Sequence, residues 1–482
     1  LLAAVSDRSQ FFLFTGRSLA VRFRRSDGSP LVGKVSRSKT GKTVTEFLGI
    51  PYAEPPVGEL RFRLPRPKSP WKLPLNVTRY SKSCLQTPDS YFKGFSGAEM
   101  WNPNTPLDED CLYLNVWVPG RLDAKRKLPV MVWIYGGGFW SGTSSLDVYD
   151  GKILASEENV ILVSMNYRVS VFGFLYVGLQ EAPGNAGLLD QLEAVKWVQR
   201  NIRTFGGDPD LITGSATSPW GMETQQTLLE RALLISEACN CSVTIRDPNP
   251  DFAALVRCLK QVPAEKLLEN EWVTYEFLDF PWTPVVDHYF LMEDPRSMLQ
   301  AGNFKRTELL VGSNMDESVY FIVYYVDKIF KKDDFFTKEE FLTSNELFEQ
   351  AAFMLLPHKL RKNPIAYRWA LDKMLGDYYF TCHANEFAKS YYQHGSQVYY
   401  YYFTHRSSQQ TWPKWMGVLH GYEINFLYGE PLNTVDYSYT ESEKQLSRRF
   451  MRYWANFGRK GDVCCQDGSL TILPTPYPHL GY

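Results

Sequence analysis

The fold is decided by one stretch, Val130-Met131-Val132-Trp133-Ile134-Tyr135-Gly136-Gly137-Gly138-Phe139, an apolar run that ends at three glycines and an aromatic residue. The run predicts a buried β-strand. The glycines allow a sharp turn and a close approach of bare backbone to a ligand. Backbone N–H groups held at a strand end form an oxyanion hole, which stabilises a tetrahedral acyl-transfer intermediate. The triplet alone also fits an ordinary turn after a buried strand, because such a motif depends on its structural context.

Apolar runs at residues 112–118 and 160–167 flank this stretch, and residues 190–205 carry apolar side chains at helical spacing. Strands that alternate with helices predict an α/β fold with a mostly parallel central sheet and helices on both faces.

Other parts of the chain extend this prediction. Residues 11–24 and 43–50 read as an antiparallel start, and residues 220–380 are richer in amphipathic helix, which is expected to cover the carboxyl ends of the strands. No linker separates these parts, so one domain is predicted over residues 1–482.

Composition excludes several classes of protein. Hydrophobic residues make up 44% and aromatic residues 15% of the 482 residues, which supplies a large core and argues against disorder. The net charge of −1 gives no indication of a nucleic acid or an anionic membrane surface as partner. No apolar run approaches the roughly 20 residues of a transmembrane helix.

The eight cysteines indicate an oxidising compartment by their placement. Cys84 and Cys111 bracket one loop and are predicted to form a disulfide. Cys241 and Cys258 bracket another and are predicted to pair as well, with Cys239 as a competing partner. No Cys-x-x-Cys pair recurs and no histidine lies nearby at ligand spacing, so no metal site is predicted.

Two Asn-x-Ser/Thr triplets, at Asn76 and Asn240, fit a secreted or extracellular chain, although such triplets often arise by chance.

Several motifs carry a resemblance to a known family. They are Glu109-Asp110-Cys111-Leu112-Tyr113-Leu114-Asn115-Val116, Glu181-Ala182-Pro183-Gly184-Asn185-Ala186-Gly187-Leu188-Leu189-Asp190-Gln191, Phe205-Gly206-Gly207-Asp208-Pro209 and Trp415-Met416-Gly417-Val418-Leu419-His420-Gly421-Tyr422-Glu423, besides the glycine triplet. In this order and spacing they resemble the type-B carboxylesterase and cholinesterase family, and within it most nearly the invertebrate acetylcholinesterases. The resemblance implies an α/β-hydrolase fold and a serine esterase of choline esters, without a cofactor or a metal.

The resemblance assigns catalytic roles. It implies that His420 is the general base, that Glu317 orients it, and that Gly137 and Gly138 supply the oxyanion hole. On composition alone, Asp316 is an equal candidate for the acid. In α/β-hydrolases the acid precedes the base along the chain, and the nucleophile precedes both. The nucleophile is therefore expected before Glu317.

The nucleophile is missing. The family's serine lies in a Gly-x-Ser-x-Gly elbow, and no such pentapeptide occurs in this sequence. Gly16-Arg17-Ser18-Leu19-Ala20 is the nearest match but lies far too early. In relatives a strand, the elbow, its helix and another strand come after Asp208-Pro209. Here Thr213 is followed directly by Gly214. The residues after Gly214 resemble the segment that follows the second of these strands in relatives. The whole strand–elbow–helix–strand unit is therefore inferred to be absent.

The Thr213–Gly214 junction therefore allows two outcomes. Its flanks are expected about one strand length apart, ~17–20 Å, whereas a trans peptide joins Cα atoms only ~3.8 Å apart. Either the structure is broken at this point, or the sheet is repaired locally with the loss of buried ladder partners. A break is the expected outcome.

The resemblance also outlines a binding site. It implies that Trp101 and Tyr320 hold a quaternary ammonium group, which an indole face attracts by up to ~2 kcal/mol. Without the resemblance, Trp101 could equally be a packing residue. The outer rim is expected to contain Asp89, Trp272, Tyr324 and Trp140, and Thr87 replaces a further rim aromatic. Trp220, Leu278, Phe280, Trp282 and Phe321 are the expected acyl pocket, in which Leu278 suggests room for an acyl group larger than acetyl.

Two functions from different classes remain. The first is a cholinesterase-type ester hydrolase that lacks its serine and is therefore inactive as written. The second is a non-catalytic cell-surface adhesion or ligand-binding protein of the same family. The expected partners are a small choline ester and, as a further possibility, a second copy of the chain. The resemblance also implies that the partner of Cys382 lies beyond Tyr482, so Cys382 is predicted to be unpaired rather than bonded to Cys464 or Cys465.

Overall fold

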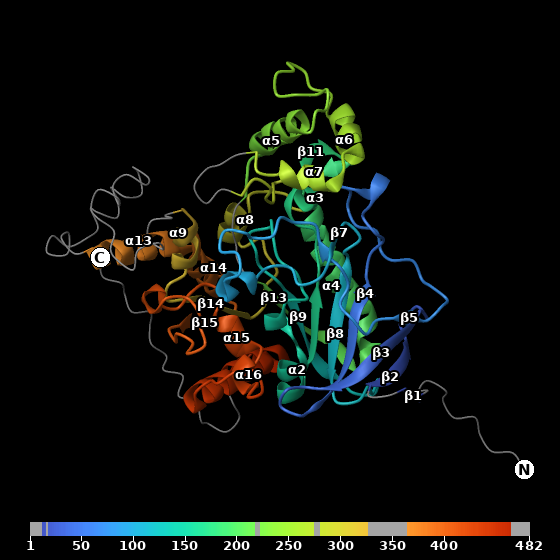
Figure 1. Ribbon diagram of the computed structural model, residues 1–482, viewed down its shortest axis with the longest axis vertical. Helices are drawn as coiled ribbons and strands as arrows, with labels where there is room; N and C mark the ends of the chain where they lie inside the picture. Colours follow the sequence, from blue (N-terminus) through green and yellow to red (C-terminus); the bar gives the residue numbers. More distant parts are fainter. Residues whose placement is uncertain (1–11, 16–17, 217–221, 274–279, 326–363, 464–482) are drawn as a thin grey trace, which may run out of the picture.

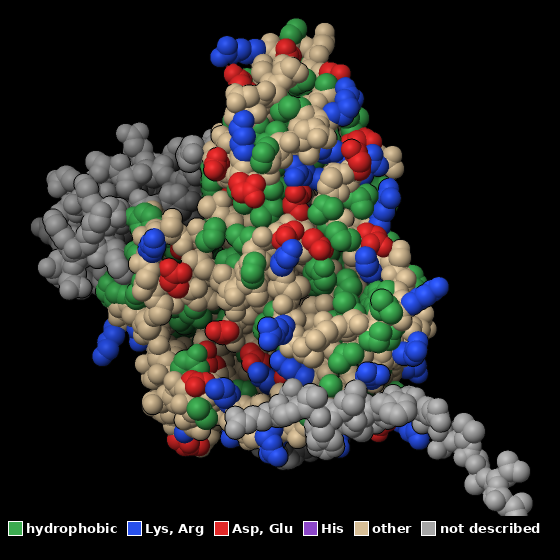
Figure 2. Space-filling model, turned by 45° about the vertical axis from the view of Figure 1, so that its right-hand side comes forward, with side chains coloured by type: hydrophobic (Ala, Val, Ile, Leu, Met, Phe, Trp, Pro, Cys, Tyr) green, Lys and Arg blue, Asp and Glu red, His purple; other side chains and the backbone are tan. Residues whose placement is uncertain are grey.

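The computed structural model describes residues 12–15, 18–216, 222–273, 280–325 and 364–463, and Figure 1 shows their arrangement. A central sheet carries helices on both faces. On the face shown in Figure 2, Lys and Arg side chains alternate with Asp and Glu, in line with the small net charge.

The main sheet has nine strands in the order β1-β2-β3-β4-β8-β10-β9-β13, with β5 paired to β3. Their bounds are β1 Phe12–Thr15, β2 Ser18–Arg24, β3 Pro30–Arg37, β4 Thr43–Pro51, β5 Leu75–Asn76, β8 Tyr113–Pro119, β9 Leu128–Ile134, β10 Ile161–Met165 and β13 Gly207–Ala216.

The sheet is mixed, not mostly parallel as predicted. From β1 to β10 each neighbour in the order is antiparallel, and the parallel part along this path is β10–β9–β13. The sequence prediction did not include β3, whose residues alternate between buried and part-buried only from Leu31 to Lys34 and whose buried Gly33 has no side chain to show an apolar pattern. β3 turns the N-terminal part into consecutive hairpins, which can only pair antiparallel.

The shorter strands are β6 Ser83–Cys84, β7 Leu107–Asp108, β11 Tyr176–Leu179, β12 Ala182–Pro183, β14 Leu309–Asn314 and β15 Val398–Phe403. The helices are α1 Ser96–Glu99, α2 Lys152–Glu158, α3 Ser170–Phe174, α4 Ala186–Asn201, α5 Gln225–Ala238, α6 Phe252–Gln261, α7 Ala264–Glu269, α8 Pro295–Ala301, α9 Val319–Tyr325, α13 Pro364–Gly376, α14 Cys382–Gln393, α15 Glu423–Leu427 and α16 Glu441–Lys460. The expected helical enrichment between 220 and 380 is confirmed for its described residues.

The core lies around β8, β10 and β9. Val130, Val132, Ile161 and Val163 are completely buried, as is Trp197 of α4. Strands buried on both faces read as continuous apolar runs, which is why these strands were recognisable in the sequence.

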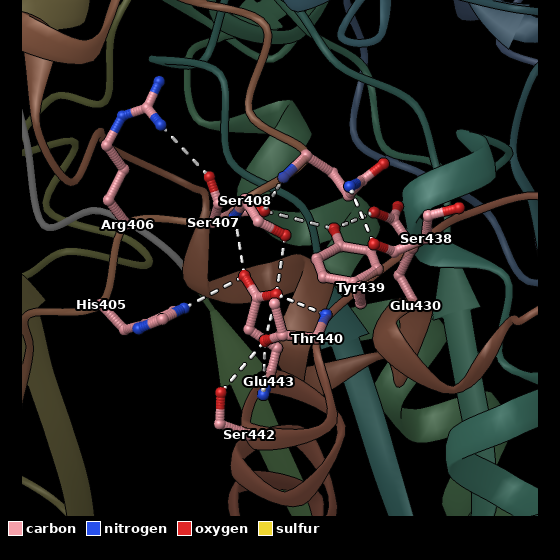
Figure 3. Close-up of polar contacts among 11 residues, drawn as sticks. His405, Arg406, Ser407, Ser408, Glu430, Ser438, Tyr439, Thr440, Ser442 and Glu443 are labelled. Atoms are coloured by element: carbon pink, nitrogen blue, oxygen red, sulfur yellow. Dashed lines mark hydrogen bonds and ion pairs between the residues drawn. The ribbon is translucent and has the colours of Figure 1, made fainter.

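α16 packs against β9 and β13. Reciprocal hydrogen bonds hold its first turn. Thr440 caps the helix by accepting from Glu443 N–H, and the Glu443 carboxylate accepts from Thr440 N–H in return. Ser408 and His405 also donate to Glu443 (Figure 3). Burial opposes ionisation of Glu443, but the hydrogen bonds from Ser408 and Thr440 outweigh it and lower its pKa to about 2.

The predicted break at the junction is wrong. β13 runs unbroken from Gly207 to Ala216, and Thr213 and Gly214 pair in register with Met131 and Val132 of β9. The second outcome therefore applies, in which one strand is fused from the two flanks and the sheet is repaired locally.

The repair leaves a visible discontinuity. In the described part of the chain, no strand pairs with the outer edge of β13, and β14 pairs in parallel only with β15, in a separate two-stranded sheet. β14 and β15 lie beyond β13 in the view of Figure 1. Leu211 of β13 is 38% exposed, unlike the buried residues of β9.

Both predicted disulfides are confirmed. The Cα atoms lie 4.9 Å apart in Cys84–Cys111 and 6.0 Å apart in Cys241–Cys258. Cys239 and Cys382 are free thiols, as predicted for Cys382, while residues 464 and 465 lie outside the described ranges. Over the described residues, no helix combines the length and apolar character that crossing a bilayer requires.

Candidate active site

Glu317 and His420 form a hydrogen-bonded pair. Glu317 lies between the end of β14 and the start of α9, and His420 precedes α15. A bridge between Asp316 and Leu419 brings the two loops together. His420 Nδ1 donates to Glu317 Oε2 at 2.6 Å, which is the hydrogen-bond distance expected of an acid that orients a base.

Asp316 plays a different structural part. Its Oδ2 accepts from Val418 N–H at 2.7 Å, and its Oδ1 lies 2.8 Å from Lys373 Nζ. The structure therefore resolves the choice that composition left open: Glu317 is the residue that reaches the imidazole, and Asp316 ties the two loops together.

A second, part-buried carboxylate supports the pair. Glu317 Oε1 accepts from Asn314 N–H at 2.6 Å, and Asn314 Nδ2 donates to Glu423 Oε2 at 2.6 Å. Burial, followed by the nearby charge of Glu317, raises the pKa of Glu423. Asn314 thus links both carboxylates on the far side of the imidazole.

The electrostatics favour a basic imidazole. Burial lowers the pKa of His420, but the Glu317 carboxylate and, more weakly, Glu423 outweigh it, so the pKa is raised from its ordinary value. Because Nδ1 donates to Glu317, Nε2 is the nitrogen left to accept a proton. Within the described residues no hydrogen bond reaches Nε2.

The glycine triplet adopts a conformation that requires glycine. Gly137 has φ +134° and Gly138 has φ +58°. A Cβ on Gly137 would lie 2.2 Å from Ser141 O, and one on Gly138 would lie 3.0 Å from the Phe280 ring. The turn is closed by Trp140 and Ser141, which both donate their backbone N–H to Gly137 O.

The end of β13 lies beside this turn. Ala216, its last residue, pairs with Ile134, three positions before Gly137. This is where a strand-to-helix elbow would begin, but the chain continues as Thr217-Ser218-Pro219-Trp220, without the pentapeptide motif and outside the described residues.

The aromatic residues predicted to hold the ammonium group lie beside His420. A Cβ on Gly421 would meet the Trp101 ring at 3.1 Å, and Trp101 also meets Tyr422 edge-on. Tyr320 belongs to the same hydrophobic cluster as Trp101. These contacts bring Trp101 next to the residue after His420 and Tyr320 into the same cluster, while a single concave site formed by Trp101, Tyr320, Glu317 and His420 stays a prediction.

The predicted rim residues lie in two groups. Tyr320 Oη and Tyr324 Oη are 2.9 Å apart, and Tyr324 donates to Asp89 Oδ2 at 2.6 Å. Trp140 and Trp272 contact edge to face, with ring centroids 5.5 Å apart.

Thr87 donates to the buried Glu271, which also accepts from Ser170. Burial raises the pKa of Glu271 despite these two donors.

Only part of the predicted acyl pocket lies within the residues that the structure describes. Phe280 contacts Gly138, and Phe321 lies 5.4 Å from His420 between ring centroids. Trp282 is fully buried in a second core cluster. Trp220 and Leu278 lie outside the described residues, so the expected room for a larger acyl group is untested.

Phe380 is a site residue that the sequence did not reveal. It lies on a single turn of π-helix (here called a π-turn), Asp377–Thr381, between α13 and α14. Its ring centroid is 4.6 Å from that of His420 and its ring stacks on Phe321. π-turns often occur at functional sites, but nothing in the local sequence spacing connects Phe380 with a histidine 40 positions later. Asn314 and Glu423 were also missed, although Glu423 ends a motif that carried the resemblance and Asn314 lies three positions before Glu317.

No group of three or more His, Cys, Asp or Glu side chains able to hold a metal ion occurs in the described ranges.

Comparison with known proteins agrees with this arrangement. The model of the carboxylesterase family matches residues 21–213 and 211–471. Acetylcholinesterase 1 of Caenorhabditis elegans is 52% identical over 497 residues, covering 92% of this chain and 80% of that protein. Acetylcholinesterase of Bungarus fasciatus is 42% identical (87% and 75% covered), and cholinesterase of Mus musculus is 41% identical (90% and 78% covered).

The matches are interrupted at the junction. The two blocks of the family match meet at residues 211–213. The alignment with the C. elegans protein, at 497 residues, is longer than the 482 residues of this chain, so part of that relative has no counterpart here.

Proposed function

The chain belongs to the carboxylesterase family, and we propose that it is a cholinesterase-type ester hydrolase by architecture that binds choline esters but, in this form, makes no acyl-enzyme. Family membership confirms the predicted α/β-hydrolase fold class. The observation that carries the proposal is the 2.6 Å contact between His420 and Glu317 beside Trp101, in a chain without a Gly-x-Ser-x-Gly motif.

The retained groups account for part of an acyl transfer. His420 Nε2 accepts a proton from an attacking hydroxyl, Glu317 stabilises the imidazolium, and the N–H groups at Gly137 and Gly138 bind the oxyanion. The step that is missing is covalent attack by a serine. Removal of a triad nucleophile leaves only the ~10³–10⁴-fold catalysis over water that the oxyanion hole and binding provide.

The ligand class is indicated by the aromatic groups. Trp101 presents an indole next to His420, and Tyr320 and Tyr324 connect this point to the carboxylate of Asp89. An aromatic face attracts a desolvated quaternary ammonium. We assign the choline end of the ester to Trp101 and Tyr320, and the acyl end to Phe280, Phe321 and Phe380.

Two measurements on the purified chain test the proposal. Tetramethylammonium and acetylcholine are expected to bind in calorimetry, whereas a fluorophosphonate is expected to leave no covalent adduct in intact-mass analysis. Acetylthiocholine turnover should stay near the residual level. A stoichiometric adduct, or turnover typical of esterases, would show that another residue replaces the serine.

The absence of the elbow motif also favours a second function, a non-catalytic ligand-binding or adhesion protein at the cell surface. The two differ in their dependence on Trp101: adhesion to cells is expected to survive Trp101→Ala, while choline-ester binding is not. An extracellular location and a homo-oligomer are part of the proposal, and both can be checked by secretion assays and by light scattering.

A further inference from the structure

Two consecutive residues of α13, Asp372 and Lys373, bind the residues on either side of Glu317. Lys373 Nζ lies 2.8 Å from Asp316 Oδ1 and 2.9 Å from Asp372 Oδ2. Ser318 Oγ donates to Asp372 O at 2.8 Å and lies 3.1 Å from Asp372 Oδ1. These contacts bracket the carboxylate that orients the imidazole.

We propose that Asp372 and Lys373 are positioning residues for the acid–base pair, because they hold Glu317 in the orientation in which it accepts from His420. This Asp372–Lys373 clamp acts on the chain before and after Glu317, so it restrains the backbone from which the carboxylate projects. The proposal rests on the proposed function in taking His420 as the general base of an ester hydrolase.

The clamp is largely enclosed by the protein. Asp372 and Ser318 are buried, and the Lys373 side chain is 25% exposed. Burial raises the pKa of Asp372 to about 6, and the charge of Lys373 acts against this rise. Removal of one partner from a buried ion pair leaves the other charge uncompensated. Loss of Lys373 would therefore force Asp316 and Asp372 to rearrange, together with the chain around Glu317.

The clamp also acts on the aromatic side of the imidazole. Three residues after Lys373, a Cβ on Gly376 would lie 3.8 Å from Glu317 Cβ, so this part of α13 packs behind the acid. α13 is followed directly by the π-turn that carries Phe380, whose ring centroid is 4.6 Å from that of His420. A shift of α13 would thus move the acid and the aromatic ring together.

A positioning role and a purely electrostatic role predict opposite changes at the imidazole. Burial lowers the pKa of His420, and the charges of Glu317 and Glu423 raise it. If Lys373 acted through its charge alone, its removal would favour the imidazolium and raise the pKa of His420 further. If Lys373 positions Glu317, its removal loosens the hydrogen bond to His420 and lowers that pKa.

NMR titration of the His420 imidazole in the purified full chain separates the two roles. Lys373→Met is expected to lower the pKa of His420 by weakening its hydrogen bond to Glu317. The imidazole resonances should also shift toward those of Phe380→Leu, the reference for loss of the Phe380 ring current. Lys389→Met, which removes an exposed lysine of α14, is the matched control and should change neither.

Ser318→Ala releases the other half of the clamp without a change of charge, so an electrostatic role predicts no effect. We expect the pKa of His420 to fall in this variant too, by less than in Lys373→Met. Ser236→Ala removes a buried hydroxyl that donates to Val243 O in another part of the chain, and it serves as the control for Ser318→Ala.

Circular dichroism checks that each variant is folded, and Ser318→Ala decides alone if Lys373→Met is not. An unchanged or raised pKa of His420 in Lys373→Met, or a titration of Ser318→Ala that matches Ser236→Ala, would overturn the proposal. The imidazole titration needs no ligand, so acetylcholine binding in calorimetry judges the proposed function separately.

Discussion

β9 and β13 are neighbouring parallel strands that end at the same edge of the sheet, yet they differ in what they contribute. β9 is buried along most of its length and leads into an intact glycine turn. β13 pairs with it in register across Thr213–Gly214, but its outer edge is unpaired in the described chain and Leu211 is exposed.

Pairing and chemistry are therefore separate properties of a strand. A fused strand satisfies the ladder on one side as well as an original strand does, because backbone groups pair irrespective of side chains. The nucleophile, by contrast, depends on the turn after a strand, and that turn is the part that the fusion replaced. The acid–base pair and the glycine turn therefore remain, next to a sheet whose strands are still paired as far as β13.

The largest expected effect compares core positions on the two strands. Met131→Ala in β9 removes a side chain that is 3% exposed and should lower the free energy of unfolding by about 2–5 kcal/mol. Leu211→Ala in β13 should cost about 0.5 kcal/mol or less, because it is a partly exposed edge position. Urea denaturation of both variants measures this, and equal losses would mean that the edge of β13 is covered in solution.

The second prediction tests ammonium binding at Trp101, a residue that lies outside the fused strand. Trp101→Ala should weaken tetramethylammonium binding by up to ~2 kcal/mol, about 30-fold in Kd, through loss of the cation–π attraction. Calorimetry measures the change. Trp71→Ala, which alters a tryptophan stacked on Arg25 in another part of the molecule, is the matched control and should leave Kd unchanged.

The third prediction concerns the helix beneath both strands. Thr440→Ala removes the N-cap of α16 and should destabilise the protein by about 1 kcal/mol. Ser442→Ala, which removes a neighbouring exposed hydroxyl, should have little effect. Thermal unfolding of the two variants distinguishes a specific cap from a general effect of hydroxyl loss.

The smallest effect is a pH dependence at the intact pair. The pKa of His420 is raised above its ordinary value of 6.5, mainly by Glu317 acting against burial. A raised pKa stabilises the fold fully below the unfolded value, and this contribution is lost as pH rises through the folded value. The stability advantage of the wild type over Glu317→Gln should therefore be largest in mildly acidic buffer and shrink in alkaline buffer. NMR titration of the imidazole should show a lower pKa in the variant, and an unchanged value would contradict the assignment.

The sequence revealed the buried part of this fold and missed its periphery. β8, β9 and β10 were recognisable because strands buried on both faces are continuous apolar runs. β3 was missed because the buried position after Leu31 is Gly33, which carries no apolar side chain, so the predicted antiparallel start lacked the strand that joins residues 11–24 to residues 43–50. Local patterns identify strands, but pairing direction depends on connections that they do not contain.

The site shows the same division. Glu317 and His420 were assigned from motifs, and the structure joins them. Phe380 could not be assigned, because its ring contacts His420 through a π-turn that residue spacing does not predict. The junction at Thr213 was located correctly, but the predicted break was wrong, because it required each flank to keep its original place in the sheet. A shortened chain instead shifted the second flank into register with β9.

An unpaired strand edge is a template for another chain. The outer edge of β13, which no described strand covers, carries the exposed Leu211, so self-association of this protein is expected to increase with its concentration. In a cell, such an edge offers a holding site to chaperones and a reason for retention before release.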